Sequence, residues 1–97
     1  KVRVVYVGGL HHRLRTRLLE ALNAAGFTAL EGTERHAGTR PTNICNRGSA
    51  GQGVQLELTR GLRRTMFQGL DRPGRRTKRA AFHRFVDVVK RVLLDAE

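Results

Sequence analysis

The chain has 97 residues, of which 39% are apolar, and a formal net charge of +11 from 19 basic and 8 acidic residues. This length allows one domain with a modest core. The single cysteine excludes an internal disulfide scaffold, and no apolar run reaches the roughly 20 residues that a membrane span requires.

Arginine dominates the positive charge, with 16 arginines and three lysines. Because the guanidinium group pairs bidentately with carboxylate and phosphate, we expect an anionic partner: nucleic acid, an acidic polymer or an acidic protein chain. The alternative is a solvated basic surface without a dedicated ligand. The sequence shows no charged start followed by the apolar stretch of a signal peptide. We therefore expect a protein of the cytoplasm, or one released on lysis, without a membrane partner.

Residues 2–30 are predicted to form a β-α-β unit. Val2–Val7 is a nearly continuous β-branched run, which is typical of a buried strand. Apolar residues then recur at helical spacing through Leu10–Ala25, and Gly26 follows as a C-cap. Phe27–Leu30 is a short second strand. Since such units cross over right-handedly, we expect the two strands to be parallel.

The second half of the chain alternates loops with shorter elements. Residues 43–53 hold three glycines and three amide side chains, which predicts a loop. Val54–Leu58 follows as a third strand, Gly61–Phe67 as a short helix and Lys78–Asp95 as an amphipathic terminal helix. We expect a three-layer α/β/α fold, with a mixed or mostly parallel sheet and helices on its faces, in a single domain spanning residues 1–97.

Glu57 is a carboxylate inside the predicted third strand, where it faces opposite to Leu56 and Leu58. If that face lines a cleft, Glu57 is poised as a general acid or base; if it faces solvent, Glu57 is an ordinary strand residue. Arg60 and Arg63 follow directly. An acid flanked by amides and guanidinium groups is typical of a site for an anionic substrate.

The histidines and the cysteine give no metal-binding pattern. No H-E-x-x-H or C-x-x-C spacing occurs, and the adjacent His11 and His12 cannot readily face one metal from a helix. Cys45 is expected to be a small buried thiol rather than a nucleophile. We predict that no zinc or other metal is bound by this chain's own residues.

Three stretches of the sequence resemble one known family, the zinc-dependent poly-γ-glutamate hydrolases of bacteriophage and bacilli, which have a zinc carboxypeptidase-like fold. The stretches are Tyr6–Leu10, Asn43–Gly48, and Gly53–Leu58 with Arg60–Arg63. The resemblance implies that nearly the whole chain corresponds to the C-terminal part of a larger hydrolase domain. The fold is then incomplete here, and we expect further sequence ahead of Lys1.

The resemblance also implies a chemistry, zinc-assisted amide hydrolysis, in which the metal polarises the scissile carbonyl and activates a water. By its match to the strand glutamate of zinc carboxypeptidases, Glu57 would be the catalytic general base. The family's zinc ligands belong to its N-terminal half, and no such motif stands in this sequence. We therefore expect zinc in the full-length protein, and neither zinc nor activity in this chain alone. The substrate-binding candidates are Asn43, Asn46, Arg47, Arg60 and Arg63.

Two functional hypotheses result. The first is hydrolysis of poly-γ-glutamate or a related γ-glutamyl substrate, an anionic polymer whose free α-carboxylates suit an arginine-rich groove. The alternative is a small basic nucleic-acid-binding module of the kind associated with phage replication, based on the net charge of +11. Against the alternative, aromatic residues for base stacking are few and no standard nucleic-acid-reading motif is visible.

Overall fold

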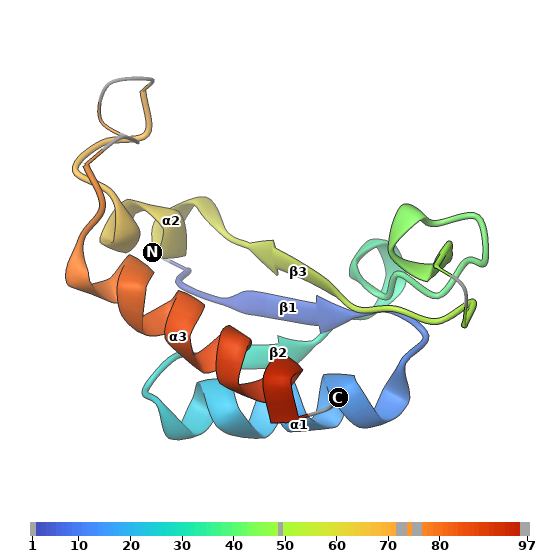
Figure 1. The fold of residues 1–97 in the computed structure, drawn as a ribbon. Helices are drawn as coiled ribbons and strands as arrows, with labels where there is room; N and C mark the ends of the chain where they lie inside the picture. The colour runs from blue at the N-terminus through green and yellow to red at the C-terminus, as the bar shows by residue number, and fades with distance from the viewer. Residues whose placement is uncertain (1, 49, 72–73, 75–76, 96–97) are drawn as a thin grey trace.

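The sheet is mixed and has three strands in the order β2-β1-β3 (Figure 1). In this computed structural model, the central strand β1 (Val5–Gly8) pairs in parallel with β2 (Ala29–Glu31) and antiparallel with β3 (Gln55–Leu58). The predicted mixed α/β class is confirmed, and the parallel pairing of the first two strands agrees with the expected β-α-β crossover. The residues that the structure describes are 2–48, 50–71, 74 and 77–95.

Three helices accompany the sheet: α1 (His12–Ala24), α2 (Arg60–Met66) and α3 (Ala80–Asp95). Two short 3₁₀ turns, η1 (Glu34–His36) and η2 (Ile44–Asn46), lie in the long connection between β2 and β3. Among the described helices, none is long and apolar enough to cross a membrane.

The core lies on one face of the sheet. Val5 and Val7 of β1 are fully buried there against Leu18 and Leu22 of α1. Phe85 of α3 belongs to the same cluster, and Figure 1 shows α1 and α3 side by side on this face. Burying apolar side chains at alternate strand positions against amphipathic helices is the dominant stabilising contribution in such a fold.

The opposite face of the sheet carries a different set of side chains. Tyr6 points away from Val5 and Val7, and its partners across the strands are Leu30 and Glu57. Leu30 is 47% exposed, and η1 rather than a long helix lies against this face. Within the described residues, α1 and α3 therefore cover the face that carries Val5 and Val7.

Candidate functional site

Glu57 borders a hollow on the open face of the sheet. The hollow has a volume of about 310 Å³. The Glu57 side chain is 43% exposed, so it is in reach of a ligand while being anchored on a strand. Of the two readings that the sequence left open, a cleft and plain solvent, the structure places Glu57 at a hollow. The lining residues are Tyr6, Arg35, His36, Glu57, Leu58, Thr59 and Arg60.

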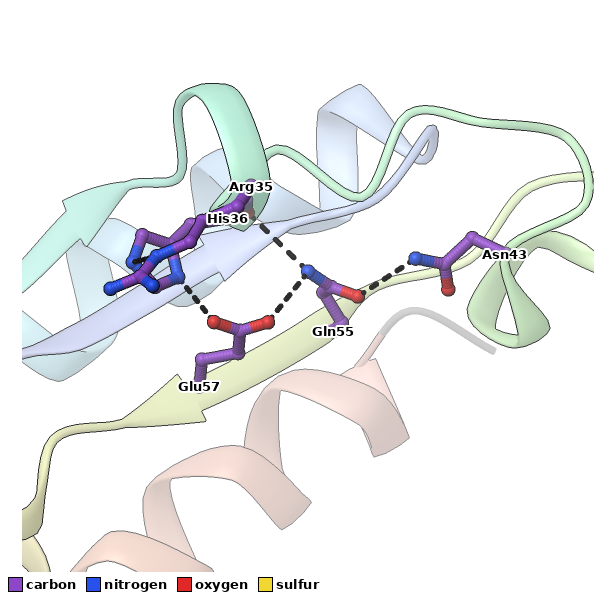
Figure 2. Close-up of polar contacts among 5 residues, drawn as sticks. All are labelled: Arg35, His36, Asn43, Gln55 and Glu57. Atoms are coloured by element: carbon purple, nitrogen blue, oxygen red, sulfur yellow. Dashed lines mark hydrogen bonds and ion pairs between the residues drawn. The ribbon is translucent and has the colours of Figure 1, made fainter.

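Each oxygen of the Glu57 carboxylate has a hydrogen-bond partner (Figure 2). Oε2 contacts Nδ1 of His36, which comes from η1. Oε1 accepts a hydrogen bond of 3.3 Å from Nε2 of Gln55. Gln55 and Glu57 can meet because alternate residues of β3 point to the same face. The carboxylate is thus held in one orientation and still has lone pairs to offer.

Asn43 is connected to Glu57 through Gln55. Its Nδ2 donates a hydrogen bond of 3.2 Å to Oε1 of Gln55 (Figure 2). Its Oδ1 accepts from the backbone N–H of Cys45 at 3.0 Å and thereby caps η2. The structure therefore places Asn43 one residue removed from Glu57, at the end of the hydrogen-bonded row Asn43–Gln55–Glu57–His36.

Asn46 has a structural position instead. The residue is 2% exposed. Oδ1 accepts from the backbone N–H groups of Leu10 and Gly53, each at 3.0 Å. Nδ2 donates to the carbonyl oxygens of Gly38 at 2.6 Å and Arg40 at 3.1 Å. These four hydrogen bonds hold the loop in place, and the predicted role of Asn46 in substrate binding stays a prediction.

The three arginines predicted to bind substrate lie in different places. Arg60 lines the Glu57 hollow. Arg60 and Arg63 also line a second cleft, of about 600 Å³, together with Arg64 and Gln68. Arg47 is exposed at the end of η2 and lines neither hollow. Within the described ranges, none of these guanidinium groups is in an ion pair.

Sequence reasoning missed three contributors to the site. Gln55 had a usable signal, because a residue two positions before Glu57 on a strand shares its face. His36 and Tyr6 had none. His36 comes from a connection without periodicity, and Tyr6 meets Glu57 only through the strand register.

The site does not by itself contain a zinc-binding group. In the described part of the chain, no three His, Cys, Asp or Glu side chains lie together as metal ligands, whereas a protein zinc site needs three or four. At the hollow, His36 and Glu57 contact each other. The residues present therefore do not fit a complete zinc centre, and the expected absence of zinc from this chain stays a prediction.

Comparison with known proteins identifies relatives of this chain. Residues 1–88 match the sequence profile of a family described as poly-gamma-glutamate hydrolase. The chain is 34% identical over 92 residues to the UPF0714 protein YndL of Bacillus subtilis (strain 168), covering 92% of this chain and 36% of YndL. It is 33% identical over 90 residues to the SPbeta prophage-derived UPF0714 protein YoqZ of the same organism, covering 90% of this chain and 33% of YoqZ.

Two solved structures have the same backbone arrangement. A bacteriophage poly-gamma-glutamate hydrolase superimposes with a TM-score of 0.90 at 33% identity, over 98% of this chain and 47% of that one. A zinc-free apo form of YndL superimposes with a TM-score of 0.91 at 30% identity, over 98% of this chain and 48% of the YndL chain. The chain thus spans about a third of these curated relatives and about half of the solved chains. These matches do not favour the nucleic-acid alternative. The chain belongs to the poly-γ-glutamate hydrolase family.

Proposed function

We propose that this chain forms the glutamate-bearing and arginine-bearing part of a hydrolase that cleaves the amide bonds of poly-γ-glutamate or a related γ-glutamyl substrate. One observation carries the proposal. Glu57, on β3, borders a hollow that it shares with two arginines, Arg35 and Arg60. A family hydrolysing an anionic polymer needs a base for the attacking water and cations for the polymer carboxylates, and this hollow has both.

Glu57 has the properties of a general base. A hydrogen bond to each oxygen fixes the plane of the carboxylate, and the 43% exposure of the side chain leaves it accessible to water. A positioned carboxylate of this kind takes a proton from water as the water attacks a carbonyl carbon. Its fixed orientation removes part of the entropic cost of reaching that geometry.

The arginines supply complementary charge for the substrate. Each unit of poly-γ-glutamate has a free α-carboxylate, and guanidinium groups bind carboxylates bidentately. Arg60 lines both the Glu57 hollow and the second cleft, which it forms with Arg63 and Arg64 and which we call the arginine cleft. We place one substrate carboxylate at Arg60 beside the scissile bond, and the carboxylates of neighbouring units along Arg63 in the cleft.

Zinc dependence is part of the proposal for the whole protein and not for these residues alone. The zinc-free form of YndL supports zinc as a metal of the family. The described residues lack a group of three possible ligands, so other residues of the complete hydrolase would hold the metal. The role assigned to this chain is to orient the substrate and to accept a proton at Glu57.

A chimera tests the proposal. In it, this chain replaces the matching segment of the bacteriophage hydrolase, whose backbone it follows with a TM-score of 0.90. Glu57→Gln keeps the shape of the side chain but cannot take a proton, so we expect kcat on poly-γ-glutamate to fall by about 10²–10⁴-fold. Turnover is measured by the new amino groups released, and zinc content is measured alongside to exclude loss of metal.

Glu20→Gln is the matched control for this experiment. Glu20 is an exposed glutamate on α1, outside the hollow. The control should retain the turnover of the parent chimera. If zinc-loaded Glu57→Gln keeps parental turnover as well, Glu57 is not the base.

A further inference from the structure

His36 is held between Tyr6 and Glu57 at the edge of the hollow. The imidazole stacks on the Tyr6 ring, with centroids 4.2 Å apart and an interplanar angle of 5°. Nδ1 contacts Oε2 of Glu57 (Figure 2). The stack sets the plane of the imidazole, and Tyr6 is itself fixed because it belongs to the central strand β1.

Two contacts together determine which ring nitrogen carries the proton. Nε of Arg35 lies 3.4 Å from Nε2 of His36 and can only donate. Nε2 is therefore an acceptor and the proton is on Nδ1. An ionised carboxylate accepts hydrogen bonds only, so Nδ1–H donates to Glu57. We assign the tautomer that has its proton on Nδ1, where it is donated to Glu57.

The backbone of η1 is fixed against the sheet in a way that suits this geometry. Gly32 donates a backbone hydrogen bond of 2.9 Å to the carbonyl oxygen of Val7 on β1. A Cβ at Gly8 or at Gly32 would collide with the carbonyl oxygen of His36. That carbonyl also accepts from Nε2 of Gln55 at 3.4 Å, the same amide nitrogen that donates to Glu57. The two glycines thus permit the close approach that brings His36 to Glu57.

We propose that His36 is a positioning residue for Glu57: the imidazole, oriented by Tyr6 and Arg35, fixes the carboxylate through Nδ1–H. The inference rests on the proposed function, because it assigns His36 to the base of that reaction. His36 acts through Glu57 and does not itself exchange a proton with the substrate. This role is distinct from metal ligation, since Nδ1 and Nε2 both already have partners.

The first test uses the chain itself and requires no activity. Long-range ¹H–¹⁵N correlation spectra at alkaline pH report which imidazole nitrogen is protonated. We expect the His36 proton on Nδ1, whereas free neutral histidine favours Nε2. Glu57→Ala removes the acceptor and should shift His36 toward the Nε2 form, while His83, exposed on α3, stays unchanged. A proton on Nε2 of His36 before mutation, or a spectrum indifferent to Glu57→Ala, overturns the inference.

The second test uses the chimera and separates positioning from structure. His36→Leu removes the donor, and we expect kcat to fall by up to about 100-fold with KM unchanged. A rate loss of this size is typical when a catalytic group is displaced from its productive position. His36→Asn places an amide N–H near the position of Nδ1 and should recover most of kcat. Equal losses in the Leu and Asn variants, or a change in KM alone, contradict the inference.

The two tests also distinguish the inference from the function on which it rests. If Glu57→Gln leaves turnover intact, the proposed function fails whatever the spectra show. If Glu57→Gln abolishes turnover but His36→Leu does not lower it, the function stands and the positioning role is wrong. Circular dichroism of each variant confirms that the comparison is made between folded proteins.

Discussion

Asn46 is a residue whose burial decides its role. A buried amide is tolerated only when its polar atoms have partners, and Asn46 has them in the backbone on either side of the loop before β3. It joins the start of α1, through Leu10, to the loop that leads into β3, through Gly53. The Gly-rich connection therefore has a defined shape although its sequence has no periodicity.

Removing this side chain should destabilise the protein. Asn46→Ala leaves partly buried backbone groups without their side-chain partner, so we expect the free energy of unfolding to fall by about 1–3 kcal/mol. The neighbouring Arg47→Ala, at an exposed position, should change it by no more than about 0.5 kcal/mol. Urea unfolding followed by circular dichroism measures both variants. Equal stabilities would show that the Asn46 hydrogen bonds are not needed by the fold.

The contrast between Asn46 and Glu57 shows how far the sequence predicts a site. The side of the strand on which Glu57 lies follows from a two-residue period, and the structure agrees. In a loop no period tells which amide points inward, so Asn43 and Asn46 look alike in the sequence. Residue type alone also cannot predict that His36, 21 positions away, contacts Glu57, because that contact depends on tertiary packing.

At the scale of elements, α2 presents a basic surface next to the site. Thr59 caps the helix by accepting from the N–H of Leu62 at 3.3 Å. Leu62 and Met66 are buried one turn apart. The helix places its arginines on another side, where residues three and four positions apart are neighbours. The exposed arginines of α2 are Arg60, Arg63 and Arg64.

This arrangement predicts a dependence on substrate length. In the chimera, Arg63→Gln should raise KM for long poly-γ-glutamate by about 2- to 5-fold. This factor corresponds to the loss of one exposed ion pair, which contributes up to ~1 kcal/mol of binding free energy. It should raise KM for a γ-glutamyl dipeptide less, because Arg63 lines the arginine-bearing cleft and not the hollow between Glu57 and His36, although it shares another hollow with Glu57. Steady-state kinetics on both substrates, with Arg91→Gln on α3 as the control, measure this difference. An equal effect on the two substrates argues against a polymer-binding cleft.

Element boundaries differ from the sequence prediction for local reasons. β1 begins at Val5 instead of Val2, and the carbonyl of Val2 accepts from the hydroxyl of Thr59 at 2.9 Å rather than from a strand partner. α1 begins at His12 instead of Leu10, because His11 caps it by accepting from the N–H of Leu14 at 3.2 Å. Hydrophobic periodicity locates elements, whereas these side-chain contacts decide where they end.

At the scale of the whole molecule, the positive charge is poorly compensated. The Arg15–Glu31 pair, at 2.9 Å, is the arginine–carboxylate bridge found within the described residues. A net charge of +11 attracts polyanions from a distance. Attraction of this kind is not selective, so specificity for a γ-glutamyl polymer has to come from the hollow and the arginine cleft.

The chain as a whole should bind no stoichiometric zinc. After dialysis against metal-free buffer, we expect elemental analysis of the purified chain to find well under one zinc per molecule. The physical reason is the lack of three potential ligands in one place among the described residues. One tightly held zinc per chain would contradict this expectation and would make His36 and Glu57 candidate ligands.

The contact between His36 and Glu57 joins two parts of the molecule that differ in how they are held. Glu57 lies on β3, which is hydrogen-bonded to the central strand, so its backbone should open only when the sheet unfolds. His36 lies on a three-residue turn. Short turns with few backbone hydrogen bonds open locally, at lower free-energy cost than strands in a core. The contact between His36 and Glu57 therefore depends on η1 staying packed against the sheet, and amide hydrogen exchange in η1 would measure how often this packing opens while the sheet stays folded.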